Sequence, residues 1–97
     1  MNQIVIQAIR DHLTLEVRYH GYSRIVEPHA YGTNAKYQPL LRCYQISGGS
    51  ESGERAGWKL LLLDEARGIT ATATKFAGAR PGYRRGDSAM QHILAQL

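Results

Sequence analysis

The sequence is poor in the features that disulfides, cysteine metal sites and membrane spans require. Cys43 is the only cysteine, which excludes an internal disulfide and a cysteine zinc cluster. The longest apolar run, Leu60 to Leu63, is far too short to span a bilayer. Residues 1–17 carry charges within any candidate signal-peptide core. We therefore expect a cytoplasmic protein without a membrane partner.

Catalytic and cofactor motifs are also missing. The stretch SGGSESG lacks the lysine and the strand-to-helix setting of a phosphate-binding loop. The histidines are too scattered for a metal motif. Cys43 stands in a strand-like run, where a small buried thiol is a better interpretation than a nucleophile. We expect no enzyme activity, no metal and no cofactor.

The composition is that of one small globular domain, which we expect to cover residues 1–97. The chain is 43% hydrophobic and 21% charged, enough for one modest core. Its net charge of +4 favours a polyanionic partner only weakly, because many basic proteins bind no nucleic acid. Three arginines, Arg80, Arg84 and Arg85, cluster near the C-terminal end.

The hydrophobic pattern predicts a helix, five short strands and a second helix. Apolar residues share one helical face over residues 2–13, and Asp87 or Ser88 is the candidate N-cap of the closing helix. The run at residues 58–66 is nearly continuous in apolar character, which is typical of a strand buried on both faces. The fold class is therefore α+β, mainly β: a small bent five-stranded barrel with an N-terminal and a C-terminal helix. The five strands are expected at residues 13–20, 24–32, 40–46, 58–66 and 69–76, with loops at 33–39, 47–57 and 77–86.

The second predicted strand, RIVEPHAYG, carries an unusual set of polar side chains. Pro28 cannot donate to a strand ladder, so we expect it at an edge or a bulge. Arg24 and His29 lie on opposite parities of the strand. Both can face one flat site only if Pro28 marks a bulge.

Tyrosines and cations alternate along the predicted strands, with Arg42 and Tyr44 on the same face. The arginine guanidinium makes bidentate hydrogen bonds to phosphate, and tyrosine rings stack on bases. Such a face can therefore hold a nucleotide or a single nucleic-acid strand. The alternative is that tyrosine is simply a favoured strand residue and that the arginines are solvated or paired with carboxylates. The candidate ligand-binding residues are Arg24, His29, Tyr31, Tyr37, Arg42, Tyr44 and Lys59.

Several short motifs resemble the bacterial WYL domain, and above all its small stand-alone members. These are VEPHAYG, LLRCYQ, GWKL and RPGYRRGD, in that order, and the resemblance runs from about Leu13 to Asp87. It implies an Sm-like, SH3-type barrel that senses a ligand. WYL domains are usually fused to a helix-turn-helix domain in transcription regulators, including regulators of phage defence. Their basic and aromatic face is thought to bind nucleic acid or nucleotide-like effectors.

Carried over by position, the resemblance places Arg42 and Tyr44 where the family's strand after the Trp-Tyr-Leu motif has its arginine and aromatic. It places Arg24 and His29 in the family's R-x-V-x-P-H strand, and Lys59 in the strand that usually carries basic residues before a Leu-Asp pair. Two departures stand out. Pro39–Leu41 replaces the Trp-Tyr-Leu triad, so only the leucine remains. The 97 residues also leave no room for a helix-turn-helix domain, so we expect sensing without an output domain, action through a partner, or direct binding of nucleic acid.

Two functional hypotheses follow. The first is a non-enzymatic, regulatory module that binds nucleic acid or a nucleotide-like anionic ligand on the basic, tyrosine-bearing face. The alternative is a protein-interaction or self-assembly module, such as a homodimer, that pairs through a strand edge or the closing helix and binds no nucleic acid. Salt dependence distinguishes them, because phosphate binding weakens steeply as salt rises.

Overall fold

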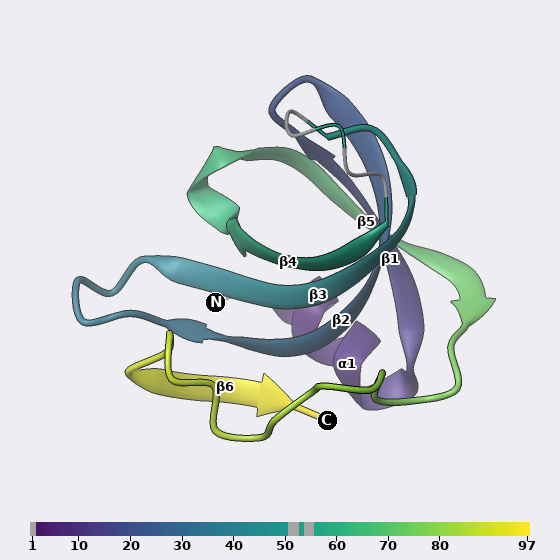
Figure 1. The fold of residues 1–97 in the computed structure, drawn as a ribbon. Coiled ribbons are helices and arrows are strands. Elements are labelled where there is room, and N and C mark those ends of the chain that lie inside the picture. The colour runs from purple at the N-terminus through teal and green to yellow at the C-terminus, as the bar shows by residue number, and fades with distance from the viewer. Residues whose placement is uncertain (1, 51–52, 54–55) are drawn as a thin grey trace.

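The computed structural model describes residues 2–50, 53 and 56–97, and over these residues it is a mainly β fold with one α-helix (Figure 1). Six strands form a single antiparallel sheet in the order β4-β3-β2-β1-β5, and β6 pairs with β2. The long strand β2 is central, because β3 lies along one of its edges while β1 and β6 share the other. The elements are α1 (Gln3–Asp11), β1 (Leu13–Tyr19), β2 (Tyr22–Thr33), β3 (Pro39–Gly48), β4 (Gly57–Leu62), the 3-10 turn η1 (Leu63–Glu65), β5 (Ala66–Lys75) and β6 (His92–Gln96).

The N-terminal helix was predicted and is confirmed. The Asn2 side chain accepts a hydrogen bond from the Val5 N–H at 3.2 Å and so caps the first turn. His12 ends the helix in the left-handed conformation, at φ 56°, and its N–H bonds the carbonyls of the last turn. Between these caps the apolar face of α1 packs into the main core.

The main core lies on the inner face of the sheet, defined here as the face that packs against α1. Alternate residues of β1 to β4 point inward, as strand geometry requires. Tyr31 belongs to this core, and its hydroxyl accepts a hydrogen bond from the Asn2 N–H at 3.0 Å. The fully buried strand residues of the core are Leu15, Val17, Val26, Leu41 and Cys43.

The expected bulge at Pro28 is confirmed. The β2–β3 register shifts between Pro28 and Ala30, which leaves His29 as the extra residue. Pro28 lies opposite Cys43, between the part of β2 that pairs with β1 and the part that pairs with β6. A residue without an N–H is tolerated at such a bulge.

The prediction of a closed five-stranded barrel was wrong. The sheet is open, since β4 and β5 are its two edges and are joined by η1 without pairing to each other. At the end of β4, the Leu62 N–H donates instead to the hydroxyl of Tyr19 on β1, at 3.1 Å. A sixth strand, β6, extends the sheet where we expected none.

The prediction of a C-terminal helix was also wrong, because residues 92–96 form β6. The far half of β2 has no other strand on that edge, and its backbone groups need partners. Residues 91–97 supply them: the Gln91 N–H donates to the Thr33 carbonyl at 2.7 Å, and the Leu97 N–H to the His29 carbonyl at 2.9 Å. A long-range sheet edge thus outweighed a local helical pattern.

The expectation for residues 58–66 was wrong as well. β4 ends at Leu62 and lies at the sheet edge, where Leu61 is buried but Leu60 is 40% exposed. Of the predicted loops, 33–39 and 77–86 contain the irregular segments we expected. Residues 51–52 and 54–55 of the predicted 47–57 loop lie outside the described residues. No helix in the described part of the chain is long and apolar enough to cross a membrane.

Candidate functional site

A segment that we call the strap, residues 77–91, connects β5 to β6 and contacts β2, β3 and β4 through Glu27, Arg42 and Trp58. Its apolar anchor is Met90, which is buried against Ala30 and Leu40 in a second, smaller core. Tyr83 and Ala89 also pack against this core, and polar and aromatic contacts join the strap to residues of the predicted site.

The first fastening joins Arg80 of the strap to β2. Its guanidinium donates to both Glu27 carboxylate oxygens, at 2.7 and 3.1 Å, in a bidentate pair. The same guanidinium lies 4.4 Å from the centre of the Tyr44 ring, within the range of a cation–π contact. The side-chain hydrogen bond to Glu27 raises the pKa of Arg80 above its usual value, so Arg80 stays charged.

His29, the bulge residue, completes this fastening. It is fully buried, and its Nδ1 lies 2.8 Å from the Glu27 carbonyl oxygen. Its Nε2 lies 3.0 Å from the Arg80 main-chain N–H, which donates to it. Nδ1 must therefore carry the proton and Nε2 must be bare, which makes the ring neutral. Burial lowers the pKa of His29 and favours this state.

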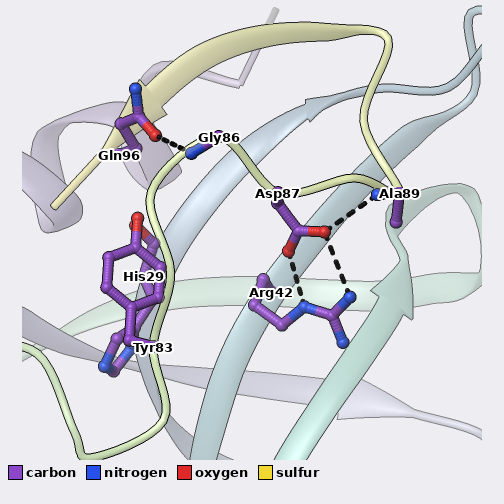
Figure 2. A network of polar contacts seen from close by, with 7 residues as sticks. All are labelled: His29, Arg42, Tyr83, Gly86, Asp87, Ala89 and Gln96. Carbon is purple, nitrogen blue, oxygen red and sulfur yellow. Dashed lines mark hydrogen bonds and ion pairs between the residues drawn. The ribbon is translucent and has the colours of Figure 1, made fainter.

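The second fastening joins Asp87 of the strap to Arg42 of β3 (Figure 2). Arg42 donates through Nε and Nη2 to the two carboxylate oxygens, at 2.6 and 3.2 Å. The Ala89 N–H also donates to Asp87, at 2.9 Å. The hydrogen bond to Arg42 holds the pKa of Asp87 below its usual range, so the ion pair persists at neutral pH. Asp87, predicted to cap a helix, caps a turn and holds the strap instead.

Between the two fastenings lies the strap pocket, a cavity of about 500 Å³. Arg42 and Trp58 line it from the sheet, and residues 82–88 line it from the strap. The rings of Trp58 and Tyr83 are nearly parallel, at 21°, with their centres 6.3 Å apart. The His29 ring makes edge-to-face contacts with both of these rings.

The two arginines that the strap contributes to the pocket, Arg84 and Arg85, differ in their hydrogen-bond partners. Arg85 donates through Nε to the Leu97 carbonyl at 2.9 Å. Arg84 is exposed, and within residues 2–50, 53 and 56–97 nothing pairs with its guanidinium. Likewise the Trp58 indole N–H finds no acceptor in the described part of the chain. The pocket thus presents unused donors beside an aromatic wall.

The seven predicted site residues do not share one surface. Arg42 lines the pocket, and His29 and Tyr44 lie directly behind it, each in edge-to-face contact with Trp58. Tyr31 is a core residue. Tyr37, in the turn between β2 and β3, is 74% exposed and stacks on His92. Arg24 and Lys59 lie on the inner side of the sheet.

Arg24 is 96% buried, since only 4% of its surface is exposed. It donates one hydrogen bond to the Tyr19 carbonyl at 3.3 Å and lies over the Tyr19 ring at 5.1 Å. Lys59 faces the same side, because it pairs with buried Cys43, and its Nζ lies 3.3 Å from the Ser50 hydroxyl. Even with the bulge, Arg24 and His29 therefore face opposite sides of the sheet.

Sequence reasoning missed Trp58, Tyr83 and Arg84 as pocket residues. The signal was present in the arginine cluster at the C-terminal end and in the motif RPGYRRGD. We interpreted that segment as an irregular connection to a helix, and nothing local in it shows that it folds back over the sheet.

Comparison of the chain with family models, curated proteins and solved structures found no match. Among the residues that the structure describes, no three histidine, cysteine or acidic side chains gather as a metal site would need.

Proposed function

We propose that this protein is a non-enzymatic binding module that recognises nucleic acid or a nucleotide-like anionic ligand at the strap pocket. The observation that carries this proposal is Arg84, an exposed guanidinium at the pocket with no partner among the described residues, beside the unpaired indole N–H of Trp58. Guanidinium groups bind phosphate and aromatic rings stack on bases, so the pocket offers both halves of nucleotide recognition.

We further propose that the chain is a small WYL-type domain with a regulatory role. The four motifs that carry the resemblance meet in space. Glu27 and His29 come from VEPHAYG, Arg42 and Tyr44 from LLRCYQ, Trp58 from GWKL, and the strap residues from RPGYRRGD. Segments far apart in the sequence that build one pocket are more simply explained by a shared site than by separate structural needs.

The test is fluorescence anisotropy of a labelled single-stranded oligonucleotide, titrated with the protein at low and at physiological salt. We expect binding that weakens as salt rises, and a loss of about tenfold in affinity for Arg84→Ala. Arg67→Ala is the matched control, because Arg67 is an exposed arginine on β5, outside the pocket. No binding at low salt, or equal losses in both variants, would refute the proposal.

One observation favours the alternative of self-assembly. β5 is an edge strand of ten residues, with β1 on one side and no strand on the other in the described part of the chain. Its central residues carry no charge, and such edges pair readily with another strand. Size-exclusion chromatography with light scattering decides this: a dimer lost in Thr70→Pro supports pairing through β5, and a monomer excludes it.

A further inference from the structure

The strap is tied to the sheet on both sides of the strap pocket, which limits how a polymer can enter it. On one side Arg80 ties the strap to Glu27 and His29, and on the other Asp87 ties it to Arg42, as Figure 2 shows for the second tie. The lining residues 82–88 lie between these ties or at the second one. A strand cannot thread between strap and sheet without breaking a bidentate ion pair, so an intact strap favours the end of a chain or a small molecule inside the pocket.

The charge of the lining also distinguishes between phosphate types. Arg42, Arg84 and Arg85 contribute three guanidinium groups and Asp87 one carboxylate, and three minus one leaves two positive charges. A phosphate monoester carries a charge of about −1.5 to −2 at neutral pH, whereas each internal phosphodiester carries about −1. The pocket matches the monoester more closely.

Arg42 can serve both its ion pair and a ligand. A guanidinium has five N–H donors, and Asp87 uses one on Nε and one on Nη2. Three donors therefore remain, and the side chain keeps 29% of its surface exposed. Asp87 fixes the orientation of the group while leaving donors for a second anion.

Building on the function proposed above, we propose that the strap pocket takes a nucleotide by its terminal phosphate. The phosphate monoester would be held by Arg84, Arg85 and the remaining donors of Arg42, with the base against Trp58. The same chemistry is offered by a free mononucleotide and by the phosphorylated end of a single strand.

The experiment compares three internally labelled oligonucleotides of one sequence: one with a 5′-phosphate, one with a 3′-phosphate, and one with hydroxyl groups at both ends. We expect one phosphorylated form to bind about tenfold more tightly than the hydroxyl form. Arg84→Ala should abolish that difference, and Arg67→Ala should preserve it. Competition with adenosine monophosphate, against adenosine as the control, identifies the source: displacement by the nucleotide shows that a free nucleotide suffices, and its failure assigns the site to strand ends.

The two proposals fail in different ways. If all three oligonucleotides bind alike in an Arg84-dependent manner, and adenosine monophosphate competes no better than adenosine, binding at the pocket stands and the terminal-phosphate inference is overturned. If none of the oligonucleotides or nucleotides binds at low salt, the proposed function fails and the inference fails with it.

Discussion

At the scale of single residues, His29 joins the fold to the site. Both of its ring nitrogens are engaged, one with the Glu27 carbonyl and the other with the Arg80 N–H. A second proton on the ring would sit on Nε2, facing that N–H donor. Protonation of His29 therefore removes one of the hydrogen bonds that hold the strap at Arg80.

We predict that stability falls as the pH drops below about 6.5, the ordinary pKa of histidine. Burial lowers the pKa of His29 in the folded state, so below this pH the unfolded chain binds more protons than the folded one. The contribution of neutral His29 to the free energy of unfolding is complete above that pH, and it is lost as the pH falls toward the folded-state pKa. Urea unfolding at several pH values measures the slope of the free energy of unfolding against pH.

The matched variants for this prediction are His29→Gln and His92→Gln. His92 is an exposed histidine that stacks on Tyr37. The first variant should lose part of the slope between neutral and mildly acidic pH, and the second should keep it. Equal slopes in all three proteins would show that another group is responsible.

Arg24 is a second residue whose role is not simple stabilisation. Its guanidinium is buried, and its Nε has no hydrogen-bond acceptor among the described residues. We predict that Arg24→Met raises the free energy of unfolding by about 1 kcal/mol, because removing a desolvated charge gains more than the contacts with Tyr19 and Tyr22 contribute. Thermal unfolding tests this, and a lower Tm in the variant would contradict it.

At the scale of elements, β6 depends on a close approach to β2 that only glycine permits. A Cβ at Gly32 would lie 2.1 Å from the His92 carbonyl oxygen and 3.0 Å from the Met90 sulfur. Gly32 therefore sets how closely β6 and the apolar anchor of the strap pack on the sheet.

We predict that Gly32→Ala destabilises the protein by about 1–3 kcal/mol, since β6 and Met90 must move outward. Gly68→Ala is the matched control, because apart from its chain neighbours nothing lies within 4 Å of a Cβ built there, and it should change stability by less than about 0.5 kcal/mol. Chemical denaturation measures both. Similar values for the two variants would show that β6 adjusts without cost.

At the scale of the whole molecule, two ion pairs of opposite polarity fix the strap. The strap supplies the cation to Glu27 and the anion to Arg42. The sequence separations are 53 and 45 residues, so the pocket forms only when the sheet and the strap are both in place.

We predict that a double-mutant cycle on Arg42→Ala and Asp87→Ala gives a coupling energy of about 1–3 kcal/mol. The Asp87 side chain is only 8% exposed, so water screens this pair less than a surface pair. Additive effects, with no coupling, would show that the pair does not hold the strap. Either single variant should also weaken ligand binding, because it opens one end of the pocket.

Local physical chemistry determined much of this protein from the sequence alone. The helix α1, the alternation of Leu41, Arg42 and Cys43, and the irregularity at Pro28 all follow from neighbouring residues, and the sequence predicted each of them, though not the caps of α1. It also placed Arg42 and Tyr44 on one face of their strand.

Only the tertiary structure decided the rest. Residues 87–97 carry a helical pattern, yet the unpaired edge of β2 draws residues 92–96 into a strand. The predicted binding face divides between two sides of the sheet, and the pocket gains Arg84 and Trp58 from segments that no local pattern joins. The physical reason is the same in each case: backbone groups on a sheet edge and charges near a core take partners wherever the whole chain provides them, and those partners lie tens of residues away.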